Sequence, residues 1–330
     1  MNTIILNNKC YIKSFASVAG EMEADGPYGK YFDIVFSDPL LEQETWEKAE
    51  SELQKSAIER AIEKSHYKKE DIKAVIAGDL LNQCTASTFS SRESNIPYIG
   101  VYGACSTMAL SMAVGSFLVS GGFKERVVAA TSSHFCTAER QYRFPLEYGG
   151  QRTPSQQHTV TGAGAVVITN EKTDLYINAI TLGKIVDFGI TDATNMGAAM
   201  APSAADTILT FFKETNTTPA NYDALFTGDL GEIGSKLLID ILKENGVDIT
   251  PIYDDCGVMI YDAERQDVHA GGSGCGCSAS ILCGYILNMM SRNELKNVLF
   301  CATGALQSPT SANQNESIPG VSHLINIKVM

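Results

Sequence analysis

The sequence predicts an α/β protein made of two similar halves, in which two mixed sheets have helices packed between them and outside them. Three observations support this layered αβαβα fold class. The chain has 330 residues and is 44% hydrophobic, which is enough to build a large core. Apolar runs typical of strands alternate with runs of helical spacing. Two segments also repeat in the same order along the chain.

The first repeat spans a strand and the turn that follows it. EDIKAVIAGDL at 70–80 reappears as ANYDALFTGDL at 220–230, and both segments end in Gly-Asp-Leu. Each pattern is typical of an apolar strand preceded by a helix, and we expect these helices at 41–65 and 201–216. Pro202 suits the first turn of the second helix.

The second repeat is longer and contains a cysteine in both copies. Residues 103–133 align without gaps with residues 275–305, so that Cys105 falls on Cys277, and each copy predicts a buried helix followed by a strand. Extra residues at 256–272 fit an insertion, where we expect two strands joined by a turn. Two repeats in one order indicate a duplicated unit, with an N-terminal half at 1–172 and a C-terminal half at 173–330.

Charge and cysteine content exclude several classes of protein. The formal net charge is −13 and no basic run occurs, which argues against a nucleic-acid partner, because phosphate binding needs clustered Lys and Arg. The start, MNTIILNNKCYIKSF, lacks a signal-peptide pattern, and the most apolar stretch, 108–119, is too short to cross a bilayer. Nine scattered cysteines are typical of reduced thiols. We therefore expect a cytoplasmic protein.

The repeats also predict where ligand chemistry lies. In α/β folds, ligands bind at the carboxyl ends of strands, so the two Gly-Asp-Leu turns, Gly-Ala-Cys-Ser and GGSGCGCS should converge between the halves. A cysteine at a helix N-terminus has its thiolate stabilised by free N–H groups and the helix dipole, which makes Cys105 a candidate nucleophile. The alternative is simple packing, since small cysteines are common in buried turns.

These residues resemble a known superfamily over essentially the whole chain. The duplicated halves, Ala-Cys-Ser before an apolar helix, NMGAAMAPSAADTI at 195–208 and the Gly-rich loop before the second buried helix are similar to thiolases and ketoacyl synthases. The resemblance implies that Cys105 carries an acyl group. It also implies that the protein forms a homodimer. Asp229 stands about where that superfamily has a histidine, and GGSGCGCS lacks the asparagine. A carboxylate there would repel a developing oxyanion, so condensation is disfavoured.

A narrower resemblance is to the stage V sporulation protein AD family of spore-forming bacteria. It rests on AGDLLNQ, GACST, AATSSH, TAERQ, EYGGQ, GGSGCGCSA, ATGAL and ESIPGVSH. The resemblance implies a non-catalytic protein that binds pyridine-2,6-dicarboxylic acid (dipicolinic acid), free or with Ca²⁺, and supports its uptake into the developing spore. It implies a location peripheral to the inner forespore membrane, with channel proteins of the same uptake system as partners. No cofactor is expected. An acyltransferase that uses Cys105 is the alternative.

A pocket for a planar dicarboxylate needs hydrogen-bond donors for two carboxylates and an apolar slot for the ring. The expected ligand-binding residues are Cys105, Asp79, Asn82, Gln83, His134, Arg140, Arg143, Arg152, Asp229, Gly272 and Ser273. Of these, Asp79 and Asp229 are the candidates to hold a calcium ion that is shared with the ligand.

Each of these candidates also has a purely structural interpretation. Arg140 and Arg143 could pair with nearby glutamates on a solvated loop. His134 could be a hydrogen-bonded residue at the end of a strand. The two aspartates could cap the backbone turns that follow their strands.

Overall fold

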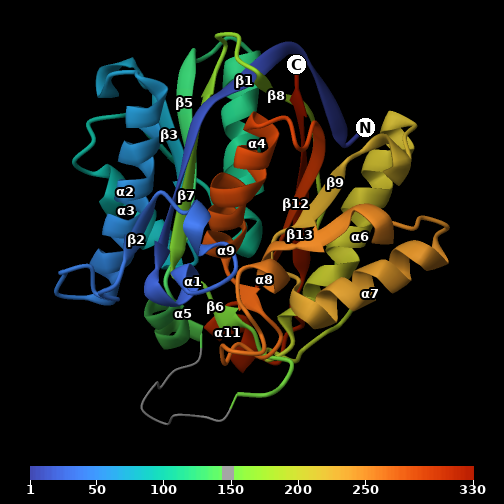
Figure 1. The fold of residues 1–330 in the computed structure, drawn as a ribbon. Coiled ribbons are helices and arrows are strands. Elements are labelled where there is room, and N and C mark those ends of the chain that lie inside the picture. The colour runs from blue at the N-terminus through green and yellow to red at the C-terminus, as the bar shows by residue number, and fades with distance from the viewer. Residues whose placement is uncertain (143–151) are drawn as a thin grey trace.

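The computed structural model describes residues 1–142 and 152–330, and it has the five layers that the sequence predicts. Helices form the two outer layers and the central layer, and strands separate them (Figure 1). The longer helices are α2 (Trp46–Ser65) and α3 (Thr85–Ser91) on one outer face, α4 (Thr107–Ser120) and α9 (Cys275–Ile281) in the centre, and α6 (Met196–Thr215) and α7 (Gly231–Glu244) on the other outer face.

The strands of the two β layers are linked into one sheet. Their order is β10-β9-β12-β13-β8-β1-β7-β5-β3-β4, and β2 pairs with β1. The bounds are β1 (Thr3–Gly20), β2 (Ile34–Phe36), β3 (Ala74–Gly78), β4 (Tyr98–Gly100), β5 (Arg126–Ser133), β7 (Gly162–Thr169), β8 (Leu175–Leu182), β9 (Ala224–Thr227), β10 (Tyr253–Asp255), β12 (Asn297–Ala305) and β13 (Gly320–Val329).

Short elements connect these strands and helices. They are α1 (Glu21–Ala24), α5 (Phe135–Tyr142), α8 (Cys256–Met259), α10 (Leu287–Ser291), α11 (Pro309–Asn313), β6 (His158–Thr159), β11 (Gly272–Ser273), the 3₁₀ turns η1 (Gly29–Tyr31), η2 (Lys69–Asp71), η3 (Asn82–Cys84), η4 (Ala104–Ser106), η6 (Pro219–Asn221) and η7 (Thr250–Ile252), and the π-helical turn η8 (Leu282–Ile286).

The two halves of the sheet repeat the same pairing pattern. β1-β7-β5-β3-β4 and β8-β13-β12-β9-β10 each contain two antiparallel pairings followed by two parallel ones. This order agrees with the duplication inferred from the repeats. The boundary we predict after residue 172 falls in the turn between β7 and β8 and stays a prediction.

The expected separation into two sheets is wrong, because β1 joins them. β1 pairs antiparallel with β7 through residues 11–19 and with β8 through residues 3–5 and 10–12. Its register shifts between Ile5 and Cys10 and between Ile12 and Ser14, and such irregularities let one strand bend enough to serve two arrays.

Capping side chains move the starts of two expected helices. α2 begins at Trp46, later than expected, because Thr45 Oγ1 accepts a hydrogen bond from the Lys48 N–H at 3.3 Å. α6 begins at Met196, earlier than expected, because Asn195 Oδ1 caps it. Pro202 therefore lies in the second turn of α6, and its expected place in the first turn is wrong.

The insertion at 256–272 does not form the expected pair of strands. Asp255 Oδ1 accepts a hydrogen bond from the Val258 N–H at 3.1 Å and caps the short helix α8. The chain then turns into β11, which pairs in parallel with β6 from the other half, through Gly272 opposite His158. The insertion thus ties the two halves together beside the expected site.

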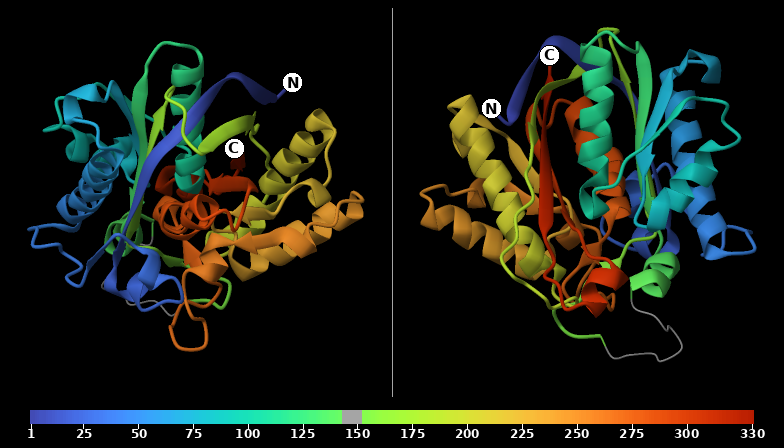
Figure 2. Two further views of the ribbon diagram at one scale, coloured as in Figure 1. Left: turned by 45° about the horizontal axis from the view of Figure 1, so that its top comes forward. Right: turned by 180° about the vertical axis from the view of Figure 1, so that it is seen from behind.

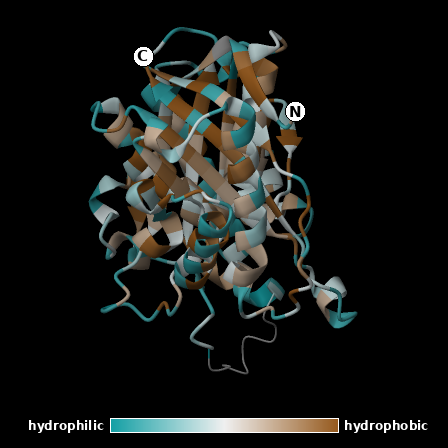
Figure 3. Cartoon of the chain, turned by 90° about the vertical axis from the view of Figure 1, so that its right-hand side faces the viewer, coloured by the Kyte–Doolittle hydropathy of each residue, from teal (hydrophilic) through white to brown (hydrophobic). Residues whose placement is uncertain are grey.

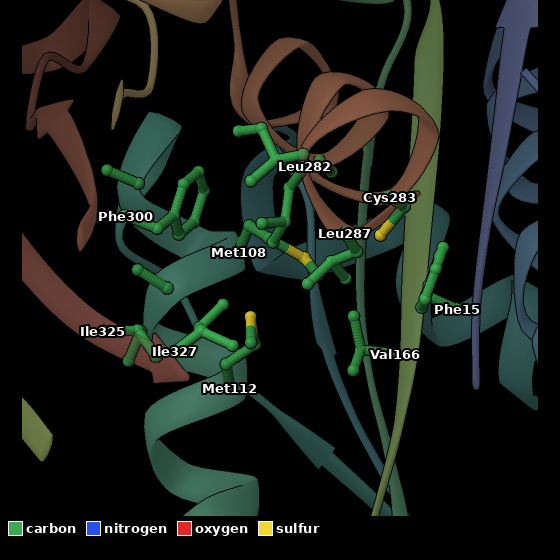
Figure 4. Close-up of a cluster of buried hydrophobic side chains, with 14 of the residues drawn as sticks. Phe15, Met108, Met112, Val166, Leu282, Cys283, Leu287, Phe300, Ile325 and Ile327 are labelled. Carbon is green, nitrogen blue, oxygen red and sulfur yellow. The ribbon is translucent and has the colours of Figure 1, made fainter. Parts of the chain in front are cut away.

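The central layer is apolar on every side because both of its faces contact strands. α4 carries Met108 and Met112 toward Leu282 of η8 and Leu287 of α10, the two elements that follow α9 (Figure 4). Strands on the two sides close the cluster with Phe15, Val166, Phe300, Ile325 and Ile327. Hydrophobic residues run along the strands, whereas the loops at the lower end are largely hydrophilic (Figure 3). None of the helices in the described ranges has the length and apolarity needed to cross a membrane.

Met112→Ala should destabilise the fold by about 2–5 kcal/mol, because Met112 is fully buried and its removal leaves a cavity. Chemical denaturation measures this change. The matched control is Met330→Ala, since Met330 is 54% exposed and its truncation should change stability by less than about 0.5 kcal/mol. Equal effects of the two variants would contradict the packing described for the central layer.

Candidate binding site

The turn that presents Cys105 is held by its own side chains and by a strand of the other half. Ala104 has a left-handed φ of 49°, and the turn is closed by hydrogen bonds from Ser106 Oγ to the Gly103 carbonyl at 2.7 Å and from Thr107 Oγ1 to the Ala104 carbonyl at 2.6 Å. Gly304 of β12 lies so close to the Gly103 carbonyl that any side chain at 304 would clash. Cys105 is thereby fixed between the halves.

A second turn, before α9, brings Asp229 and Ser273 to Cys105. Gly274 has φ 99°, a conformation that favours glycine, and its N–H donates to Asp229 Oδ2 at 2.7 Å. Gln157 Nε2 donates to the carbonyls of Asp229, at 2.8 Å, and Gly272, at 2.6 Å. The two strand-end turns therefore converge as the repeats predict.

The electrostatics of this turn disfavour a thiolate. Asp229 is fully buried, which raises the pKa of its carboxyl to about 7, and no hydrogen bond of normal geometry from the described residues reaches Oδ1. Burial, and then the neighbouring Asp229 carboxyl, raise the pKa of the Cys105 thiol well above its ordinary value. Cys105 is therefore protonated at neutral pH, which differs from the expected stabilisation by the helix start.

A cavity of about 280 Å³ opens at Cys105, and its wall is mostly apolar. No Lys, Arg or His of the described residues lines it. It is lined by Leu80, Ala104, Cys105, Ala138, Tyr142, Gln156, Thr159, Ala193, Thr194, Met196, Met200, Ser273, Ala305 and Gln307. Cys105 and Ser273 are the predicted residues on this wall, while Asp229 and Gly272 lie directly behind it.

The predicted arginines are not brought to this cavity. Arg140 pairs with Glu47 and lies over the Trp46 ring, 5.5 Å from its centroid. Arg152 pairs with Asp267 on the insertion. Arg143 lies outside the described residues. Each of the two described arginines thus pairs with a carboxylate away from the cavity.

Asp79 and His134 are engaged by the backbone. Asp79 accepts hydrogen bonds from the Leu81 N–H at 2.8 Å and from the N–H and hydroxyl of Ser87 at 2.7 and 2.6 Å. His134 Nδ1 accepts from the Cys136 N–H, so Nε2 donates to the Pro39 carbonyl at 2.8 Å. Burial lowers the pKa of His134, which keeps the ring neutral.

Asn82 and Gln83 line a smaller cavity that adjoins the first. No group of three or more His, Cys, Asp and Glu side chains is arranged to hold a metal ion in residues 1–142 and 152–330. A calcium ion in this region would therefore need oxygen ligands supplied by the bound molecule as well as by the protein.

Sequence reasoning missed much of the cavity wall. Tyr142 ends α5, Met200 lies in α6, and Gln307 follows β12. The second repeat ends at Ala305, and continuing its displacement would place Gln307 on Phe135, so the repeat gave no signal for Gln307. For Tyr142 and Met200 the chain carried no signal beyond ordinary amphipathic spacing.

Asp229→Asn should stabilise the protein as pH rises. The folded carboxyl holds its proton up to about pH 7, whereas the unfolded one releases it near 3.8, so folding opposes ionisation. The resulting loss of wild-type stability relative to Asp229→Asn is absent below about pH 4, grows up to about pH 7 and reaches about 4 kcal/mol. Denaturation of both proteins from pH 4 to 8 measures it. A stability difference that does not widen with pH would contradict the raised pKa.

Comparisons with known proteins identify the family of this chain. The family model described as Stage V sporulation protein AD (SpoVAD) matches residues 1–328. Stage V sporulation protein AD of Bacillus subtilis (strain 168) is 46% identical over 321 residues, which cover 97% of this chain and 95% of that protein.

Solved structures of low identity share the fold. Human mitochondrial 3-ketoacyl-CoA thiolase in complex with CoA has a TM-score of 0.59 at 12% identity, with 99% of both chains covered. The 3-oxoacyl-[acyl-carrier-protein] synthase III of Aquifex aeolicus VF5 has a TM-score of 0.58 at 10% identity, with 97% of this chain and 99% of that chain covered. The fold is thus that of thiolases and ketoacyl synthases, and the chain belongs to the stage V sporulation protein AD family.

Proposed function

We propose that this protein binds pyridine-2,6-dicarboxylic acid, free or as its calcium complex, and supports its uptake into the developing spore during sporulation. Membership of the sporulation family supports the biological setting. The observation that carries the biochemical part is the cavity at Cys105, which keeps the position of an acyl site but holds a protonated thiol beside a carboxyl group.

The cavity suits a small planar ring. At about 280 Å³ it lies near the lower end of the range for small-molecule sites, which fits a ligand of about a dozen non-hydrogen atoms. Its apolar wall accommodates the ring faces. Because the described wall has no cationic side chain, it favours a ligand whose charge is already neutralised, as in the calcium complex, over the free dianion.

Asp229 is the better placed of the two candidates to face a calcium ion. Among the described residues, none makes a hydrogen bond of normal geometry to Asp229 Oδ1, whereas both oxygens of Asp79 accept bonds from Leu81 and Ser87. A carboxylate oxygen is a hard ligand of the kind that calcium prefers. The remaining ligands would come from the carboxylates and ring nitrogen of the bound acid.

The acyltransferase alternative has weaker support. A nucleophilic cysteine needs a base or a lowered pKa, but burial and Asp229 both raise the pKa of Cys105. Asp229 would also oppose the negative charge that develops on a thioester carbonyl. The channel partners and the position at the inner forespore membrane stay predictions from the family resemblance.

Titration calorimetry with pyridine-2,6-dicarboxylate, with and without Ca²⁺, tests this function. We expect saturable binding that benzene-1,2-dicarboxylate does not reproduce, and no mass increase on Cys105 after exposure to acyl-CoA. Ala193→Trp should weaken binding at least tenfold by filling the cavity, whereas Ala312→Trp on exposed α11 should not. Absence of binding with and without Ca²⁺, or a stable acyl-enzyme, would refute the proposal.

We also propose a homodimer formed through the edge strand β4. β4 ends the sheet order, so one side of its backbone has no strand partner in the described chain. Exposed apolar side chains surround it, with Ile99 37% exposed and Phe89 43% exposed. Pairing of two β4 strands would bury these side chains and continue the sheet into a second copy.

Ile99→Lys should shift the protein toward the monomer, because it places like charges opposite each other across the two-fold axis. Sedimentation velocity at several concentrations measures the shift. The matched control is Val35→Lys on β2, which is also an exposed strand position. A monomeric wild-type protein, or a dimer that Ile99→Lys leaves intact, would contradict this interface.

A further inference from the structure

A second cavity, of about 230 Å³, lies beside the one at Cys105. Its sides come from both halves, with Leu81, Asn82 and Gln83 after β3 and Leu306, Gln307 and Ser308 after β12. Tyr102 and Tyr142 complete the wall. Tyr142 and Gln307 border both cavities, so these two side chains form the partition between them.

The tyrosine hydroxyls at this partition have no hydrogen left for a ligand. Tyr142 Oη donates to the Leu80 carbonyl at 2.6 Å. Tyr102 Oη lies 3.2 Å from Tyr142 Oη and therefore donates to it. The same carbonyl also accepts from Gln141 Nε2 at 2.9 Å. These bonds fix both rings and leave side-chain amides as the uncommitted donors of the second cavity.

Gln307 is the unusual member of this wall. Its side chain is 8% exposed, yet Oε1 has no hydrogen-bond partner, and no hydrogen bond of its amide is found within the described part of the chain. Buried polar groups are nearly always bonded, so an unpaired one at a cavity wall indicates a missing partner. Asn82 and Gln83 place two more amides at the exposed rim, and Gln83 has a φ of 57°.

The second cavity is uncharged as well. No Lys, Arg or His of the described residues lines it, and no Asp or Glu does. A carboxylate that enters it would meet amide N–H donors without repulsion from an acidic side chain. The two ends of an amide exchange by rotation about one bond, so Gln307 can direct Nε2 into the cavity.

We propose that this second cavity is a carboxylate subsite, in which Gln307 donates its amide to one carboxylate of a dicarboxylate whose ring occupies the first cavity. The inference rests on the proposed function and deepens it, because it names the residue that recognises the second carboxylate. Because the donors are uncharged, the subsite selects ligands by where their second carboxylate lies as well as by its charge. This suits a chain whose net charge of −13 repels anions at long range.

Comparison of the diacid with pyridine-2-carboxylate, which lacks the second carboxylate, tests the subsite. Wild-type protein should bind the diacid at least tenfold more tightly than the monoacid, and Gln307→Leu should remove most of that difference by weakening the diacid alone. Calorimetry measures the diacid, and displacement of bound diacid measures the monoacid. Gln307→Glu should weaken the diacid further through like charge.

Gln314→Leu is the matched control, because Gln314 follows α11 on the exposed surface and should leave both affinities unchanged. Thermal melting of each variant confirms that it is folded. Equal losses for diacid and monoacid in Gln307→Leu, or no loss for either, would overturn the subsite while leaving the proposed function intact. A wild-type protein that binds neither compound would remove the proposed function, and the subsite with it.

Discussion

The enclosure of the two central helices between strand layers constrains the rest of the molecule. α4 and α9 contact strands on both faces, so their interior positions are restricted to apolar or small residues. Polar chemistry between the halves is therefore possible only where these helices begin. Cys105 and Ser273 lie at those two starts, and the turns that hold them use left-handed backbone at Ala104 and Gly274. Packing thus determines where a site can exist.

The residues around those turns decide what the site can do. Burial of the Asp229 carboxyl beside the Cys105 thiol raises the pKa of both groups, so the thiol stays protonated and the carboxyl is partly protonated near pH 7. A catalytic cysteine needs the opposite, a neighbouring base or a lowered pKa. The same arrangement leaves the buried Asp229 Oδ1 without a hydrogen bond of normal geometry from the described residues. Figure 2 shows that the turns at this end of the sheet come from both halves, so the site depends on the packing of one half against the other.

Much of the fold could be predicted from the sequence, because repeated segments and apolar periodicity report local structure directly. The duplicated strand order and the convergence of Cys105, Asp229 and Ser273 follow from this information. The sheet connection through β1 could not be predicted, since it depends on bulges that bend a strand. The positions of the arginine side chains could not be predicted from the sequence either. Arg140 could contact a ligand or a carboxylate of the protein, and only the folded structure shows that it pairs with Glu47.

The pairing of β1 with both arrays affects how the chain reaches its native state. The N-terminal strand contacts β8, about half the chain away, and β8 in turn pairs with β13 at the C-terminus (Figure 1). Contacts between such distant segments form slowly, because a long loop must close before they gain any stability. Although the sequence is duplicated, the C-terminal array stays incomplete until β13 inserts between β8 and β12, so folding intermediates expose unpaired edges on these two strands.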